Sequence, residues 1–280
     1  MARKPAVAGA FYPKSAQRLR SDIGSMLDGA HGGVGAVDGV LSFVAPHAGY
    51  MYSGAVAAYA YRALETAWAA KIFETVVVIG PNHTGEGDPL AVSMEDWETP
   101  LGIVKNDTEL AGEIVDGGNG AITVDEAAHT GEHSVEVQLP FLQMVAGKAR
   151  CAFICMGDQS PAAAEALADA ILWAEERMGR RVTVLASSDF NHYEDARTAK
   201  AKDTPLIDAL CRLDVAGFYN ALARTDDSAC GFGPMAAAAM FARSKGAKAG
   251  RLLKYTNSGE TTGDYSSVVA YASLLFGRQE

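Results

Sequence analysis

Four runs of apolar and β-branched residues constrain the fold of this chain more than any other feature. They lie at residues 39–46 (GVLSFVAP), 75–81 (TVVVIGP), 151–157 (CAFICMG) and 181–189 (RVTVLASSD). None of them alternates between apolar and polar residues, as a strand with one face in water would. Strands that are buried on both faces are typical of parallel sheets covered by helices. The runs therefore predict a central, mostly parallel sheet.

Two stretches between these runs carry apolar residues at helical spacing, over residues 54–70 and 160–179. The second opens with Ser160 and Pro161 and ends near Gly179, which are ordinary signals for a helix start and stop. Strands and helices thus alternate along the chain. This alternation predicts an α/β fold with helices on both faces of the sheet.

The last part of the chain differs, because it has no full crossover helix. Residues 249–259 and 264–276 look like two directly connected strands, so we expect a mixed sheet with an antiparallel portion. Residues 90–107 are predicted to form a hairpin around Trp97 and Pro100. The sequence contains no repeat, linker or low-complexity tract, and we expect residues 1–280 to form a single domain.

Composition narrows the class of function. The 280 residues carry a formal net charge of −10, which argues against a nucleic-acid-binding protein. Four cysteines without a C-x-x-C pair do not suit a disulfide scaffold. The N-terminal apolar stretch is broken by Pro5 and Pro13, and no apolar run reaches the roughly 18 residues of a membrane span. We expect a cytoplasmic protein with reduced thiols and no membrane partner.

Polar residues with catalytic chemistry follow three of the predicted strands. His47 follows the first run, His83 follows the second, and Asp189 and His192 follow the fourth. Ligands of α/β sheets bind outside the carboxyl ends of the strands. One such histidine alone is most often an ordinary loop residue, but three at equivalent strand ends favour a shared site.

Cys230 lies just before a predicted helix that runs from about Pro234 to Ser244. The helix dipole and the free backbone N–H groups would favour a thiolate at this place. A thiolate is both a nucleophile and a soft metal ligand. The alternative is a small buried apolar side chain, which is the role that we predict for Cys151, Cys155 and Cys211.

The segment HTGEH at residues 129–133 formally matches the H-x-x-E-H pattern of inverted zinc peptidases. That pattern needs both histidines on one face of a helix, and Gly131 opposes a helix here. We expect His129 in a loop and His133 at the start of the following helix. His133 and Glu136 are candidates to line the same cleft, as acid/base groups or as groups that orient the others.

Eight stretches together resemble the MEMO family, whose prokaryotic members are named protein B of the AmmeMemoRadiSam system. Each stretch alone is weak, but their joint order is specific and covers residues 3 to about 273. The stretches are RKPAVAGAFYP, APHAGYMYSG, VVVIGPNHTG, TPLG, HTGEHSVEVQLPFLQ, SSDFNHY, CGFGP and YTNSG with YSSVVAYAS.

The resemblance implies the fold of type III extradiol dioxygenases, which hold non-haem Fe(II) with two histidines and a glutamate. In MEMO proteins two histidines and a cysteine build the metal site, and these fall on His47, His83 and Cys230 of this chain. Asp189 and His192 would belong to the same pocket. The resemblance names Fe(II) first, while two histidines and a thiolate also suit copper or zinc.

Three functions stay open at this point, because a thiolate in place of a carboxylate makes the site oxidisable. The first is a dioxygenase-like oxidoreductase, with His192 as acid/base and Asp189 orienting it or a bound water. The second is a non-catalytic accessory protein that works with a radical-SAM partner and an AMMECR-like protein. The third is a hydrolase, either metal-dependent or with Cys230 as nucleophile and His192 or His133 as base.

Overall fold

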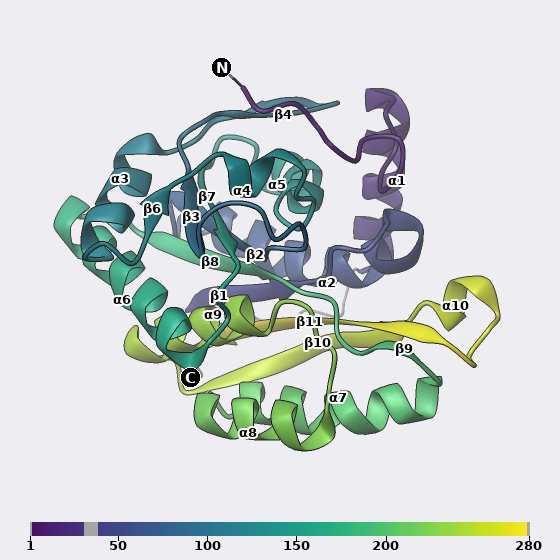
Figure 1. Cartoon of the computed structure of the whole chain (residues 1–280). Helices are drawn as coiled ribbons and strands as arrows, with labels where there is room; N and C mark the ends of the chain where they lie inside the picture. Colours follow the sequence, from purple (N-terminus) through teal and green to yellow (C-terminus); the bar gives the residue numbers. More distant parts are fainter. Residues whose placement is uncertain (1, 31–38, 279–280) are drawn as a thin grey trace.

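The centre of the fold is a mixed β-sheet (Figure 1). The computed structural model describes residues 2–30 and 39–278. Its central strands are parallel neighbours in the order β1 (Val40–Ala45), β8 (Val182–Ser187), β2 (Thr75–Pro81) and β7 (Arg150–Met156). They coincide with the four apolar runs and are buried along almost their whole length. The predicted α/β sheet is confirmed.

Antiparallel strands extend this parallel centre on both sides. β11 (Val268–Gly277) pairs with β1, and β10 (Ala249–Asn257) pairs with β11, which confirms the predicted C-terminal strand pair. The short β9 (His192–Glu194) also pairs with β11. On the opposite side, β3 (Leu90–Ser93) pairs antiparallel with β7, and β6 (Thr123–Val124) lies parallel to β3.

The hairpin predicted over residues 90–107 is shorter than expected. It consists of β4 (Trp97–Thr99) and β5 (Gly102–Val104), while residues 90–93 join the main sheet because they pair with β7. The N-terminal segment lies along the free side of β4, where Arg3 forms a β-bridge with Trp97.

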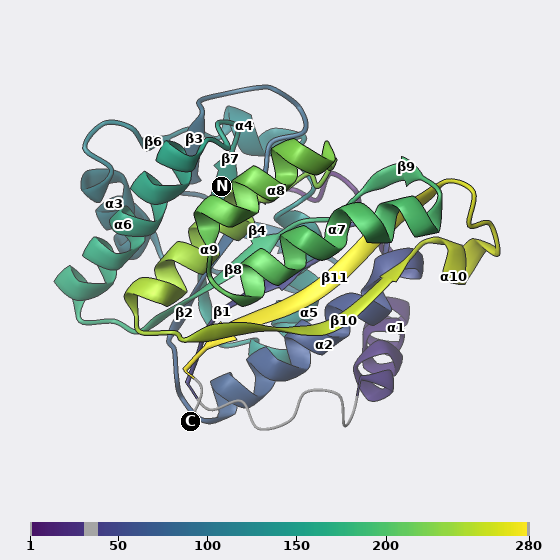
Figure 2. The same ribbon diagram turned by 90° about the horizontal axis from the view of Figure 1, so that it is seen from below.

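Helices cover both faces of the sheet, and Figure 2 shows the face that carries α6, α7, α8 and α9. Successive strand residues pack into two hydrophobic cores, one on each face of the sheet. Val76 and Val78 lie in one core, and Val77 and Ile79 lie in the other. The helices of the first face are α1 (Ala16–Gly29), α2 (Tyr50–Ala69) and α5 (Leu139–Ala146). Those of the second are α3 (Thr108–Gly117), α6 (Pro161–Met178), α7 (Ala196–Cys211), α8 (Val215–Thr225) and α9 (Phe232–Ser244). The short elements are α4 (Ala127–Thr130), the 3-10 turn η1 (Glu136–Gln138) and α10 (Gly259–Thr262).

The helices that the sequence predicted over residues 54–70 and 160–179 are present, as is the one predicted from about Pro234 to Ser244. Ser160 caps α6, because its Oγ accepts the Ala163 N–H at 3.2 Å, and the helix ends at Gly179 with a left-handed φ of 62°. α2 begins at Tyr50, earlier than the predicted residue 54. In the part of the chain that the structure describes, the helices are too short or too polar to cross a membrane.

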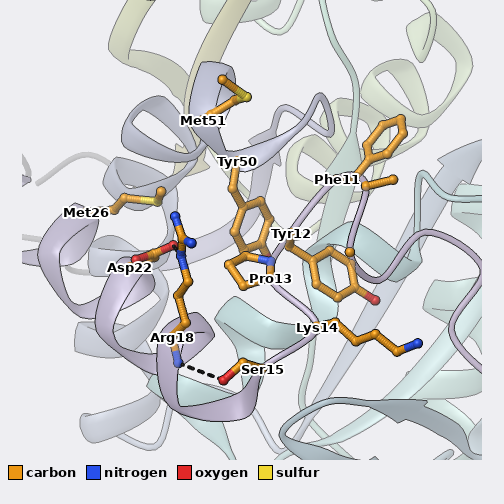
Figure 3. Close-up of a pocket in the computed structure, with 12 residues that line it drawn as sticks. Phe11, Tyr12, Pro13, Lys14, Ser15, Arg18, Asp22, Met26, Tyr50 and Met51 are labelled. Atoms are coloured by element: carbon orange, nitrogen blue, oxygen red, sulfur yellow. Dashed lines mark hydrogen bonds and ion pairs between the residues drawn. The ribbon is translucent and has the colours of Figure 1, made fainter.

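A cavity of about 540 Å³ lies between residues 9–15, α1 and the start of α2 (Figure 3). The N-terminal segment forms one wall of this cavity. At the edge of the cavity Ser15 begins α1, where its Oγ accepts the Arg18 N–H.

The register of the central strands brings three strand ends together. Ala45 of β1 pairs with Ser187 of β8, and Ile79 of β2 pairs with Ala186 of β8. Because these strands are parallel, their carboxyl ends lie at the same edge of the sheet. The residues that follow β1, β2 and β8 therefore meet at this edge.

A buried pair of carboxyl groups joins α7 to its neighbours. Asp203 is completely buried and accepts the Asn191 N–H at 3.0 Å and the Tyr255 hydroxyl at 2.6 Å. The carboxyl group of Asp227 lies close enough for the charges of the two groups to interact. Burial, followed by the charge of Asp227, raises the pKa of Asp203 to about 8. Asp203 is therefore protonated in the folded protein at neutral pH.

We expect the unfolding free energy of Asp203→Asn, relative to that of the wild type, to increase as the pH rises. The folded-state pKa of Asp203 lies above the unfolded value of about 3.9, so the folded wild type holds an extra proton across this window and loses stability as pH rises through it. An asparagine keeps the acceptor and a donor but does not titrate. Denaturant unfolding at about pH 5 and pH 9 should show a relative gain on the order of 2 kcal/mol for the variant at the higher pH.

The matched control is Asp208→Asn, because Asp208 lies exposed on the same helix α7. This control should follow the wild-type dependence on pH. Equal pH slopes for wild type and Asp203→Asn would contradict the assignment of a buried protonated carboxyl group.

Candidate metal centre

Three histidine side chains converge at the shared strand edge. His47 follows β1, His83 follows β2, and His133 lies between α4 and η1. One nitrogen of each ring lies within 4.8 Å of the others, and the ring centroids are 5.1 Å, 5.4 Å and 4.6 Å apart. The sequence predicted His47 and His83 as ligands and His133 as an acid/base group, and the structure places all three in one group.

The carboxylate of Glu132 orients two of these rings. Its Oε1 lies 3.0 Å from Nδ1 of His83 and 3.4 Å from Nδ1 of His133. The contact with His83 is a hydrogen bond in which a carboxylate can only accept, so Nδ1 of His83 carries the proton, and the negative charge favours the same tautomer of His133 through an ion-pair contact. The lone pair of both rings is therefore on Nε2.

Ser187, the last residue of β8, holds His47 in the same tautomer. Its hydroxyl donates to the Ser134 carbonyl at 2.7 Å and accepts from the Gln138 amide at 2.8 Å. The single hydroxyl hydrogen is thereby used, so Nδ1 of His47, at 2.8 Å from Oγ, must be the donor. All three rings thus keep Nε2 available for a ligand.

Glu132 is completely buried yet ionised. It also accepts the backbone N–H groups of His83, His133 and Ser134, at 2.5 Å, 2.8 Å and 2.8 Å. Burial opposes the charge, but the hydrogen bonds, above all those from His83, hold the pKa of this carboxyl well below its usual range. The site consequently contains one fixed negative charge behind two imidazoles.

Two of the histidines are neutral at neutral pH. Burial, helped by the nearby His133 and His83 rings, lowers the pKa of His47 well below its ordinary value. Burial also lowers the pKa of His133, against the opposing charge of Glu132. Neutral imidazole is the form that binds a metal ion.

Cys230 lies beside His47 at the edge of this group. Its Sγ is 3.2 Å from Nε2 of His47 and accepts the Asp189 N–H at 3.3 Å. The residue stands directly before α9, as predicted. The close approach depends on Gly231, because a Cβ there would lie 2.3 Å from the carbonyl oxygen of Ser187.

The protonation of Cys230 differs from the expectation. The sequence predicted that the start of α9 would favour a thiolate, but burial, followed by the charge of Asp189, raises the pKa of this thiol. Desolvation therefore outweighs the helix dipole, and the thiol has two acceptors in reach, Nε2 of His47 at 3.2 Å and the Asp189 carbonyl oxygen at 3.7 Å. Cys151 and Cys155 are buried in the cores as predicted, whereas Cys211 is half-buried.

Asp189 supports the loop of His47. Its Oδ1 accepts the backbone N–H groups of His47 and Ala48 at 2.8 Å and 3.3 Å. Burial raises the pKa of Asp189 to about 7, although these two hydrogen bonds oppose the change. The carboxyl group can therefore gain or lose a proton near neutral pH.

His192 lies at the start of β9 and is half-buried. Its Nδ1 is 3.0 Å from the Ser228 carbonyl oxygen, and because a carbonyl only accepts, Nδ1 carries the proton. Burial lowers the pKa of His192, and a charge on this ring would act on His47. His192 thus has its lone pair on Nε2 and lies near enough to His47 and His83 for their charges to interact, but outside the group of three histidines.

His129 and Glu136 make their contacts outside the cleft. His129 lies in the helical turn α4, not in a loop, with Nε2 at 3.2 Å from the Ala91 carbonyl and its ring against Trp97. It lies outside the group that contains His133, so the H-x-x-E-H pattern does not form a zinc-peptidase pair here. Glu136 accepts its hydrogen bonds from residues 3–12 of the N-terminal segment.

Sequence reasoning missed the residues that orient the rings. Glu132 was visible as the acid of HTGEH, but its role depends on the turn that folds its carboxylate back onto His83. Ser187 and Gln138 lie within a strand and a helical turn, where a polar residue carries no signal of its own in one sequence.

Comparison with known proteins places the whole chain in relation to one family. Residues 3–275 match the family model described as Memo-like protein. A MEMO1 family protein of Methanosarcina acetivorans is 43% identical over 275 residues, covering 98% of each chain. One of Methanopyrus kandleri is 42% identical over 289 residues, covering 99% of this chain and 100% of the relative.

A solved structure resembles the fold alone. An uncharacterized protein of Escherichia coli K12 superposes with a TM-score of 0.53 at 12% identity, covering 85% of this chain and 100% of that chain. At this identity the likeness concerns the arrangement of helices and strands and carries no information on the chemistry.

We expect the metal-free protein to show His47, His83 and His133 as Nδ1–H tautomers, because Ser187 and Glu132 accept from Nδ1 of His47 and His83, and the Glu132 carboxylate lies against Nδ1 of His133. Histidine in water prefers the other tautomer, so the signal is distinctive. Long-range ¹H–¹⁵N spectra should detect it. In Glu132→Gln the rings of His83 and His133 should lose this preference, since an amide is a weaker acceptor than a carboxylate.

His47 is the internal control in the same spectra, because Ser187 and not Glu132 holds it. A change at His47 that equals the change at the other two rings would point to a general loss of structure. Unchanged tautomers of His83 and His133 in Glu132→Gln would contradict the orienting role of Glu132.

Proposed function

Since the chain belongs to the Memo family, we propose that it binds one transition-metal ion at His47, His83 and His133, with Cys230 as an additional thiolate ligand. The observation that carries this proposal is the convergence of three imidazole nitrogens within 4.8 Å at one sheet edge. We propose further that the centre serves an oxidoreductase of the dioxygenase type, with Fe(II) as the metal.

The residues present fit such an ion. Metal–sulfur and metal–nitrogen bonds of roughly 2.3 Å and 2.0 Å would place two neighbouring ligand atoms about 3 to 3.5 Å apart. The 3.2 Å between Sγ of Cys230 and Nε2 of His47 matches this spacing. Nitrogen and sulfur donors suit iron, copper and zinc, and not magnesium or calcium.

The protein's own residues prepare the site for chemistry. Glu132 and Ser187 hold the imidazoles in the ligating tautomer, which raises their basicity. His192 keeps a free Nε2 that can take a proton from a bound substrate, and Asp189 can exchange a proton near neutral pH. A bound Fe(II) or copper ion would supply redox chemistry, and zinc would supply a Lewis acid.

The alternative of a cysteine hydrolase has weaker support. A hydrolase nucleophile needs a thiolate, whereas burial raises the pKa of the Cys230 thiol. The accessory role beside a radical-SAM protein and an AMMECR-like protein stays a prediction, because it depends on surfaces and partners and not on this centre.

Metal analysis after anaerobic purification tests the proposal. We expect about one iron or copper ion per wild-type chain, and a loss of at least about tenfold in His83→Ala and in His133→Ala, because each removes a ligand. Cys230→Ser should lower the metal content less. In the cobalt-loaded protein it should also abolish the sulfur-to-metal charge-transfer band.

Cys211→Ser is the matched control, since Cys211 is a half-buried cysteine at the end of α7, outside the centre. It should retain the wild-type metal content and spectrum. Wild-type protein that contains no transition metal, and takes up none when it is added, would refute the proposed function.

A further inference from the structure

The N-terminal segment lies against the metal-site loop, although none of its residues is a candidate ligand. Arg3 lies beside β4, where its N–H donates to the Asp96 carbonyl at 2.7 Å and its carbonyl accepts the Glu98 N–H at 2.8 Å. Figure 1 shows the chain start running along β4. The backbone of Arg3 is thereby fixed before its side chain makes any contact.

The Arg3 side chain binds three points of the segment that carries His133. Its guanidinium donates to the carbonyl oxygens of His129 and Glu132 at 2.7 Å and 2.6 Å, and to Oε2 of Glu136 at 2.8 Å. It also lies 4.0 Å from the centre of the Trp97 ring and is only 8% exposed. One planar cation thus spans the whole segment from residue 129 to 136.

Glu136 binds further residues of the N-terminal segment to the same loop that Arg3 contacts. Besides Arg3, its buried carboxylate accepts the N–H groups of Ala6 and Val7 at 2.7 Å and 3.0 Å, and the Tyr12 hydroxyl at 2.6 Å. The opposite side of residues 9–15 borders the cavity of Figure 3. The position of the segment therefore depends on Glu136 together with one-sided packing, in which Tyr12, Val7 and Phe11 contact the core.

The segment also touches the centre directly. The ring of Phe11 lies 4.7 Å from the ring of His133, and the Phe11 carbonyl accepts the N–H of Tyr50 at the start of α2. In Figure 3 the side chains of Phe11 and Tyr12 diverge from the segment. Phe11 thus contacts a candidate ligand, while Tyr12 contacts Glu136.

We propose that Arg3 is a positioning residue of the metal centre, acting through Glu132 on His83 and His133. This inference rests on the proposed function for its metal readout. The guanidinium fixes the Glu132 carbonyl, so it sets where the Glu132 carboxylate reaches the two imidazoles. A lysine could not replace it, because one ammonium group cannot present a planar fork to three acceptors.

The test compares Arg3→Lys with the matched control Arg180→Lys. Arg180 also pairs with a completely buried carboxylate, that of Asp107 at 2.6 Å, but far along the chain at the start of α3. Zinc and cobalt affinities are measured by competition with a chromophoric chelator, and folding is followed by thermal unfolding. We expect Arg3→Lys to weaken both metals by about 10- to 100-fold, and Arg180→Lys to change them less than about twofold.

A second readout needs no metal. In the metal-free Arg3→Lys protein, ¹H–¹⁵N spectra should show His83 and His133 losing the fixed Nδ1–H tautomer while His47 keeps it. Wild-type affinity together with unchanged tautomers in Arg3→Lys would overturn the inference. If wild type bound no metal, the proposed function would fail, and the spectra alone would still decide the role of Arg3.

A second variant covers the case in which Arg3→Lys does not fold. Glu136→Gln keeps the size of the side chain but weakens its bond to Arg3. It should shift the tautomers of His83 and His133 in the same direction and lower metal affinity to a smaller degree. A Glu136→Gln protein that matches wild type in both measurements would equally overturn the inference.

Discussion

The buried carboxylate of Glu132 is the interaction on which the candidate centre depends. Moving such a charge from water into a protein costs several kcal/mol unless hydrogen bonds replace the lost hydration. Here the replacement comes from the loop after β2 and from the turn before η1, through His83, His133 and Ser134. Any separation of the two loops would remove both hydrogen bonds from His83 and leave the charge with only the two backbone N–H groups of its own turn. The folded state therefore keeps two of the imidazoles together, whether or not an ion is bound.

Ser134 connects this carboxylate to the sheet. Its N–H donates to Glu132, its Oγ donates to the Pro81 carbonyl at the end of β2 at 2.8 Å, and its carbonyl accepts from Ser187 at the end of β8. The contact with β2 needs a glycine at position 80, because a Cβ there would lie 2.3 Å from Ser134 Oγ. The glycine of "IGPNH" thus serves packing at the centre and not the binding of a phosphate.

The sequence alone could predict those parts of the site that follow from strand positions. His47 and His83 stand directly after long apolar runs, and parallel strands must place such residues at one edge. Glu132 could not be assigned in the same way, because its reach toward His83 depends on a turn between two histidines. The thiol of Cys230 was misjudged for an energetic reason: the helix start was visible, but the burial that outweighs its dipole was not.

The four proposed ligands are not equally prepared for a metal ion. The imidazoles of His47 and His133 have lowered pKa values and are neutral, so an ion would meet their lone pairs without displacing a proton. Cys230 is different, because burial and the neighbouring Asp189 both favour the protonated thiol. Only a nearby positive charge offsets both effects, since a metal ion stabilises the thiolate and expels the proton. In the proposed centre the histidines would therefore bind the ion first and the ion would then draw in the cysteine, so ligation by sulfur would follow from metal binding and not cause it.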